Sequence, residues 1–158
     1  MTNANFSLNV SYSQLCVFWE TLDAPFNNWE QTHFEQGFAW RPGSACFRTI
    51  EETGKHEISV VISDHDVAVD PAAVRVIEVP FEIPNSVGLE VASVADSVMV
   101  SLAPASYSLR FELFEKAANG LVPVRLLFLT NVSPDFRVLR ADPELQVPDI
   151  LLKIAEPG

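Results

Sequence analysis

The chain has 158 residues, of which 48% are hydrophobic, and its formal net charge at pH 7 is −11. This length and apolar content exclude a disordered chain and fit one globular domain with a sizeable core. The negative charge would repel phosphate backbones and anionic membrane surfaces. Composition therefore disfavours a function in nucleic-acid or membrane binding and favours a basic partner.

No targeting or membrane-spanning segment is apparent. The first residues, Met1–Asn5, form neither a basic segment nor an apolar one, so no secretory signal is predicted and the expected location is cytoplasmic. The longest apolar stretch, Leu121–Leu129, is interrupted by a proline and an arginine and is far shorter than the roughly 18 residues that span a bilayer. In a reducing compartment, the two cysteines, Cys16 and Cys46, are most simply two buried thiols.

The first elements in the chain are strands followed by a helix. Alternating apolar and polar residues predict one or two strands between residues 7 and 20. After a turn at Asp23–Pro25, a short helix is predicted, with Asn28 as its N-cap and Gly37 after its end. Glu30 would lie in the positive first turn of this helix.

The middle of the chain continues as strands separated by turns. Alternation predicts three strands, at Ala45–Ile50, residues 57–63 and Arg75–Ile83. Pro80 and Pro84 lack amide donors, which places the third strand at a sheet edge. Residues 64–73 lose the alternation and contain three aspartates, which indicates a surface loop.

The clearest alternation spans Ser97–Phe114 and is interrupted once, at Ala103–Ser106. It predicts an antiparallel hairpin with one buried and one wetted face, around which the rest of the chain would be organised. Because a lone hairpin is marginal in water, its apolar face needs a second layer. Further strands are predicted at Val87–Val91 and Val122–Thr130, and a last one at Ile150–Ile154.

These elements predict one fold class. Strands recur with no helix between successive strands, which disfavours a parallel βαβ architecture. The predicted fold is mainly β, an antiparallel β-sandwich of about eight strands with one short helix. Residues 1–158 would form a single domain, with residues 131–158 as a tail that wraps the outside.

The sequence shows no motif for catalysis, metal binding or cofactor binding. It contains no GxSxG, no HExxH and no glycine-rich phosphate loop. The segment Asp64-His65-Asp66 is a poor metal site, because strand alternation would send the histidine away from the two carboxylates, and His33 and His56 are isolated. We therefore expect no enzyme activity, no metal and no cofactor. A hydrolase built on scattered carboxylates would instead lose activity on changing Asp64 or Asp66.

Acidic loops and aromatic residues are the candidates for partner binding. The predicted partner-binding residues are Glu51, Glu52, Asp64, Asp66, Asp70, Trp29 and Trp40. The carboxylates would meet a basic surface or simply form a solvated acidic face. The aromatics between Phe26 and Trp40 would either cover one open end of the sandwich or line a groove. A groove of this kind would suit the alternative function, a small-ligand or carbohydrate-binding module.

The N-terminal third resembles a known family. The segment Leu8–Phe18 is similar to the opening of the competence protein J family, and Asn28-Trp29 and Gln36–Ala39 follow where that family places similar residues. The resemblance implies a cytoplasmic inhibitor of a DNA-entry nuclease, made beside the nuclease and protecting the producing cell. Together with the acidity, it predicts an immunity-type protein that blocks the basic DNA-binding surface of a cognate nuclease, without binding nucleic acid or membrane itself.

Overall fold

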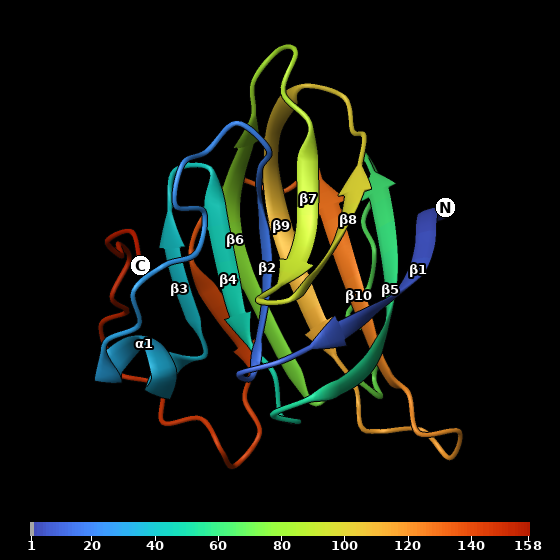
Figure 1. Cartoon of the computed structure of the whole chain (residues 1–158), viewed down its shortest axis with the longest axis vertical. Helices are drawn as coiled ribbons and strands as arrows, with labels where there is room; N and C mark the ends of the chain where they lie inside the picture. The colour runs from blue at the N-terminus through green and yellow to red at the C-terminus, as the bar shows by residue number, and fades with distance from the viewer. Residues whose placement is uncertain (1) are drawn as a thin grey trace.

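The computed structural model describes residues 2–158 and is a sandwich of two β-sheets with one short helix (Figure 1). In this part of the chain there are eleven strands rather than about eight. The elements are β1 (Thr2–Val10), β2 (Gln14–Trp19), α1 (Gln31–Gln36), β3 (Phe38–Arg41), β4 (Ser44–Arg48), β5 (Gly54–Ser63), β6 (Arg75–Ile83), β7 (Leu89–Ser93), β8 (Asp96–Val100), β9 (Ala105–Leu113), β10 (Val122–Leu129) and β11 (Arg137–Arg140).

The two sheets pack face to face around one hydrophobic core. Sheet A has six strands in the order β1-β5-β10-β9-β6-β11, and sheet B has five in the order β3-β4-β2-β7-β8. Side chains from the inner faces of both sheets form a single buried cluster. At its centre, Phe47 of β4 and Phe111 of β9 stack with ring centroids 4.6 Å apart. The predicted mainly-β sandwich with one short helix is confirmed.

The predicted hairpin over Ser97–Phe114 is wrong, because its two strands lie in different sheets. β8 pairs with β7 in sheet B, whereas β9 pairs with β6 and β10 in sheet A. Residues 101–104 cross from one sheet to the other. Alternation shows which side of a strand is apolar, but it carries no information on which strand lies beside it.

One pair of strands in sheet A, β5 and β10, departs from the predicted antiparallel arrangement. β10 lies parallel to β5, with Val122 opposite His56 and Leu129 opposite Ser63. β9 is antiparallel to β10, and β6 is antiparallel to β9, so β6 runs in the same direction as β5. The connection between β5 and β6, residues 64–74, must therefore travel from one end of sheet A to the other across its outer face.

β6 is an edge strand along only part of its length. Its neighbour β11 pairs with residues 76–78, so the half of β6 that contains Pro80 lies beyond the reach of β11. The strand predicted at Ile150–Ile154 is not formed. This segment instead lies against α1 and β3, where Leu152 N–H donates to Gln36 Oε1 and Ala155 N–H donates to Trp40 O.

Helix α1 forms where it was predicted, but its N-cap is Glu30 and not Asn28. His33, which is fully buried, explains the start, because its Nδ1 accepts the Glu30 backbone N–H at 3.0 Å. The other ring nitrogen then carries the proton and donates to Ile154 O at 3.0 Å. Gly37 ends the helix with a φ of 94°. Within residues 2–158, no helix is both long enough and apolar enough to cross a membrane.

The expectation of two free thiols is also wrong, because Cys16 and Cys46 form a disulfide. β2 and β4 pair antiparallel with these two residues directly opposite each other. Both side chains are fully buried beneath Phe18 and Trp29. A spacing of thirty residues in sequence does not reveal this register, which explains the error.

The segment after β11 is anchored by a buried ion pair. Arg75, which is 0% exposed, donates from Nε to Asp142 Oδ1 at 2.6 Å and from Nη2 to Asp142 Oδ2 at 2.9 Å. Its Nη1 donates to Arg48 O at 2.7 Å. Burial by itself would raise the pKa of Asp142, but the hydrogen bonds and charge of Arg75 outweigh it and lower the pKa below its ordinary value of 3.8.

We expect this ion pair to make stability depend on acid pH. A carboxyl group whose pKa is lowered by folding stabilises the protein fully above its unfolded pKa, about 3.9, and loses this contribution as the pH falls through the folded pKa. Urea unfolding of the wild type and of Asp142→Asn should differ strongly at pH 6, and the difference should shrink between pH 4 and pH 2. A difference that is unchanged across this range would contradict the assignment.

Candidate functional site

β5 separates the predicted acidic residues into two groups. Glu51 and Glu52 precede the strand, and Asp64 and Asp66 follow it. Since β5 has ten residues, its ends are about 30 Å apart at roughly 3.3 Å per residue. The two groups therefore lie at opposite ends of the sandwich (Figure 1), and the structure does not bring them together.

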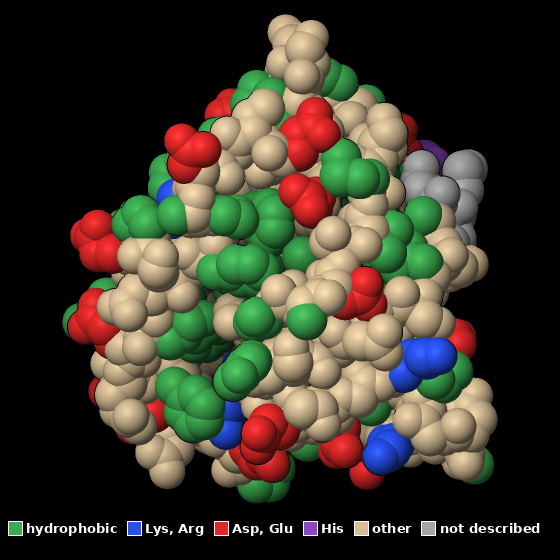
Figure 2. Space-filling model, in the orientation of Figure 1, with side chains coloured by type: hydrophobic (Ala, Val, Ile, Leu, Met, Phe, Trp, Pro, Cys, Tyr) green, Lys and Arg blue, Asp and Glu red, His purple; other side chains and the backbone are tan. Residues whose placement is uncertain are grey.

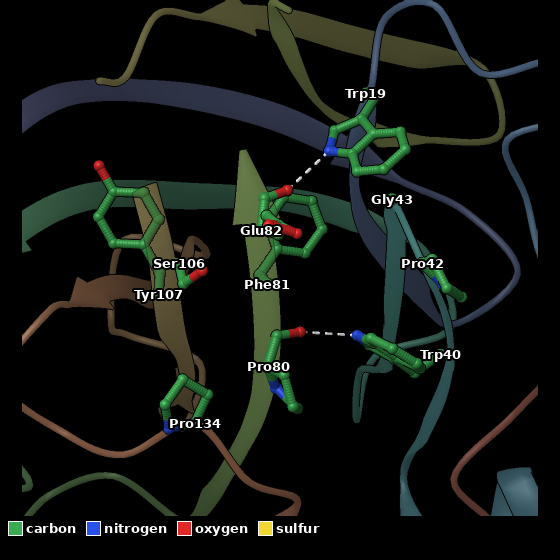
Figure 3. A pocket seen from close by; sticks show the side chains of 10 residues that line it. All are labelled: Trp19, Trp40, Pro42, Gly43, Pro80, Phe81, Glu82, Ser106, Tyr107 and Pro134. Carbon is green, nitrogen blue, oxygen red and sulfur yellow. Dashed lines mark hydrogen bonds between the residues drawn. The ribbon is translucent and has the colours of Figure 1, made fainter. Parts of the chain in front are cut away.

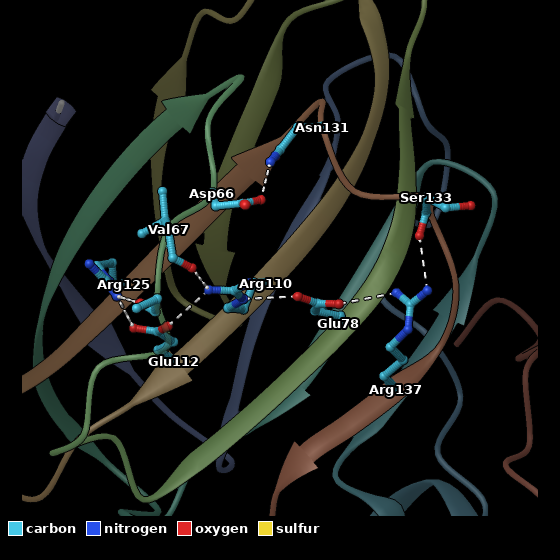
Figure 4. A network of polar contacts seen from close by, with 10 residues as sticks. Asp66, Val67, Glu78, Arg110, Glu112, Arg125, Asn131, Ser133 and Arg137 are labelled. Carbon is cyan, nitrogen blue, oxygen red and sulfur yellow. Dashed lines mark hydrogen bonds and ion pairs between the residues drawn. The ribbon is translucent and has the colours of Figure 1, made fainter.

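A row of charged side chains crosses the outer face of sheet A beneath the β5–β6 connection (Figure 4). We call it the charged row, and its members in strand order are Arg125, Glu112, Arg110, Glu78 and Arg137. Arg125 Nε lies 2.7 Å from Glu112 Oε1, Arg110 Nε lies 2.9 Å from Glu78 Oε2, and Arg137 Nη1 lies 3.1 Å from Glu78 Oε1. The charges alternate across four strands, so each carboxylate lies between two cations.

The charged row holds the backbone of the connection that carries the three aspartates. Arg110 Nη1 donates to Val67 O at 2.8 Å, and Arg125 Nη2 donates to Ala68 O at 3.3 Å. Nearer the β6 end of the connection, Arg140, which is outside the charged row, donates from Nη1 to Asp70 O at 2.9 Å. Since residues 64–74 form no helix or strand, these guanidinium groups supply hydrogen-bond donors to their carbonyls in place of backbone N–H groups.

The three predicted aspartates have different surroundings on this connection. Asp66 Oδ1 accepts a hydrogen bond from Asn131 Nδ2 at 2.6 Å, and Asp64 lies 3.2 Å from the exposed His65. Asp70 is half-buried, and its Oδ1 accepts the backbone N–H of Ala72 at 2.9 Å. Among residues 2–158, no group of three His, Cys, Asp or Glu side chains is placed to hold a metal ion.

Trp40 lines an open-sided pocket of about 320 Å³ beside the free half of β6 (Figure 3). The indole Nε1 of Trp40 donates to Pro80 O at 2.7 Å, and that of Trp19 donates to Glu82 O at 2.8 Å. The two indoles thus occupy edge carbonyls of β6 that β11 does not reach, and they protect this edge from pairing with another chain.

This pocket is less suited to a sugar than its aromatic lining suggests. Both indole N–H groups are already bonded within the chain, and the Tyr107 hydroxyl donates to Ala103 O at 2.6 Å. Carbohydrate and metabolite sites rely on a few polar groups that point at the ligand. These three polar groups are engaged within the chain, so among the lining side chains the Glu82 carboxylate and the Ser106 hydroxyl are left to meet a ligand. This small set weakens the case for a small-ligand module.

The aromatics between Phe26 and Trp40 do not line one groove. Phe26 packs beside the disulfide against Phe18, with ring centroids 5.5 Å apart, while Phe38 and Trp40 pack on Phe136. Trp29 instead lines a separate cavity of about 220 Å³, together with Tyr12, Ser13, Gln14, Phe34 and Arg48. Trp29 and Trp40, the two tryptophans predicted to bind a partner, therefore belong to different parts of the surface.

Tyr12 lines the same cavity as Trp29, but it was not selected from the sequence as a candidate binding residue. It is 75% exposed and forms, with Ser13, the tight turn between β1 and β2. Both residues have a φ of 56°, as in the turns that usually contain asparagine and glycine. Because neither residue is glycine or asparagine, no signal for this turn is visible in the sequence.

Comparisons with known proteins agree with this architecture. The family model described as Competence protein J (ComJ) matches residues 7–129. Among solved structures, the chain is similar to ComJ from Bacillus subtilis, described as an inhibitor of the DNA degrading activity of NucA, with a TM-score of 0.71 and 18% sequence identity. This match covers 82% of the present chain and 96% of ComJ. A search of curated proteins found no match. Because the family model matches well over half of its residues, the chain belongs to the competence protein J (ComJ) family.

Proposed function

We propose that this protein binds and inhibits a DNA-degrading nuclease. The observation that carries the proposal is membership of the ComJ family, in which a solved relative is described as the inhibitor of NucA. The family model spans both sheets, from within β1 to the end of β10, so most of the sandwich is shared rather than a single motif. In this role the protein acts by occupying its partner and needs no catalytic residues, metal or cofactor.

The partner surface in this proposal is the basic, DNA-binding face of the nuclease. A net charge of −11 supports it, because a protein that grips phosphates presents a positive surface that carboxylates can cover. The same charge argues against direct binding to nucleic acid or to anionic membranes. A cytoplasmic location stays a prediction.

The test is an inhibition assay with the nuclease of the same genome that is most similar to NucA. Purified protein at a twofold molar excess should abolish degradation of linear duplex DNA. Because opposite charges steer the encounter, the association rate should fall steeply between 50 and 500 mM salt. DNA degradation that continues unchanged at this excess would refute the proposed function.

A further inference from the structure

We propose that the nuclease binds at the end of the molecule that carries the β1–β2 turn; this inference rests on the proposed function. We call this region the Tyr12 surface. It consists of Tyr12, Ser13, Gln14, Trp29, Phe34 and Arg48, which surround the cavity of about 220 Å³. The occupant that we infer is a basic protein surface with an apolar side chain at its centre.

The centre of the Tyr12 surface has the chemistry of a binding hot spot. Tyr12 is 75% exposed and Phe34 is 44% exposed, although both are large aromatic side chains. The Arg48 guanidinium lies over the Phe34 ring, 3.6 Å from its centroid. Trp29 is held in place by a 3.2 Å hydrogen bond from its Nε1 to Gln14 Oε1. Tyrosine, tryptophan and arginine around a preformed hollow are the residues that dominate protein–protein binding energy.

Folding alone does not account for a tyrosine at position 12. Residues other than glycine and asparagine are disfavoured at positive φ, yet Tyr12 and Ser13 both have a φ of 56°. The surrounding backbone enforces this turn, since Ser13 N–H donates to Glu52 O and Thr49 N–H donates to Ser13 O. Because its side chain is exposed, Tyr12 gains little packing in return. Contact with a partner would explain why a strained, exposed aromatic is placed here.

The rim of the Tyr12 surface is acidic. Five glutamates lie on the elements around it: Glu30, Glu35, Glu51, Glu52 and Glu144. Glu144 is 49% exposed beside Arg48, and Glu51 is 37% exposed and pairs with Lys116 at 3.6 Å. The cations at this end are Arg48 and the buried Arg75, which both pair with Glu144, and the two lysines at positions 55 and 116. Figure 2 shows acidic side chains next to hydrophobic and basic ones at this lower end of the face in view. An acidic rim around an apolar centre complements a basic DNA-binding surface.

The size of a typical protein–protein interface shows that the Tyr12 surface and the acidic group at Asp64 and Asp66 cannot lie in the same interface. A standard interface covers about 800 Å² on each partner, which is a patch about 30 Å across. Centred on Tyr12, such a patch reaches Glu51 and Glu52. It leaves out Asp64 and Asp66, which lie beyond the far end of β5. The two predicted acidic groups thus make different contributions, and only the first lies in the proposed interface.

The decisive variant is Tyr12→Asn, because asparagine tolerates positive φ but lacks the aromatic ring. We expect the Kd for the purified NucA-like nuclease to rise at least about 30-fold, mainly through faster dissociation. Relief of strain should at the same time raise the Tm by about 2–4 °C. Opposite changes in binding and stability cannot arise from a purely structural role of Tyr12. Unchanged affinity in this folded variant would overturn the proposal.

Two matched controls locate the interface. Met99→Ala removes another exposed apolar side chain, 56% exposed on β8 near the opposite end of β2, and should leave the Kd unchanged. The double variant Asp64→Asn/Asp66→Asn should also bind like the wild type. If this double variant loses affinity while Tyr12→Asn retains it, the interface lies at the other end of β5. If the wild type itself fails to inhibit DNA degradation by the nuclease, the proposed function is refuted, and so is the assignment of the Tyr12 surface as its binding site.

Discussion

Replacing Arg110 with alanine should destabilise the protein by about 3–5 kcal/mol, the usual loss when one partner of a buried ion pair is removed. The side chain of Arg110 is 8% exposed, and its partners Glu78 and Glu112 are 3% and 0% exposed. Glu112 Oε2 has no hydrogen-bond partner and depends on the Arg110 charge 3.6 Å away. Without this guanidinium, both carboxylates lose a buried cation and Val67 O loses its donor. Urea unfolding at pH 7 measures the difference.

Arg137→Ala provides the matched control for this prediction. Arg137 belongs to the same charged row and contacts the other oxygen of Glu78, but its side chain is 34% exposed. Water can replace much of its interaction, so the expected loss is about 1 kcal/mol or less. If Arg110→Ala and Arg137→Ala lose similar free energies of unfolding, burial does not control the strength of the row.

A second large effect is expected at the centre of the sandwich. Phe111→Ala should cost about 3–5 kcal/mol, because it removes a fully buried ring and leaves a cavity between the sheets. Phe47 would lose its stacking partner, which adds about 0.5–1.5 kcal/mol beyond the buried area.

The same substitution at Phe34 is the control, because that ring is 44% exposed on the surface. Phe34→Ala should lower the free energy of unfolding much less than Phe111→Ala. Thermal and urea unfolding of both variants would give the comparison. A loss below about 1 kcal/mol at Phe111 would show that the two sheets are not held together by this pair.

Sequence alone predicted strands better than it predicted their partners. The alternation at Arg75–Ile83 reproduces β6 residue for residue, because burial of one face imposes a period of two. The same signal failed over Ser97–Phe114, where two well-formed strands belong to opposite sheets. β11 went unnoticed because its four residues are mostly half-exposed and show no apolar face.

The proposed Tyr12 surface overlaps in part with the residues predicted from the sequence, whose role in binding stays a prediction. Glu51, Glu52 and Trp29 were selected from sequence, and all three lie on or beside the Tyr12 surface. Tyr12 itself was not selected, because it is distinguished by a positive φ, which its residue type does not indicate. Trp40 was grouped with Trp29 through closeness in sequence, yet its indole is turned toward β6.

The parallel pairing of β5 with β10 has a consequence for synthesis on the ribosome. All strands of sheet B have been synthesised once residue 100 is made. By contrast, β5 ends at residue 63, and its partner β10 begins only at residue 122. At about 5–20 residues per second, the roughly 60 intervening residues take about 3–12 s to translate. During that interval one edge of β5, with its apolar Val60 and Val61, has no neighbouring strand. The nascent chain therefore presents an unpaired apolar strand edge until β10 is made, and this edge is where a chaperone that holds extended chains would act.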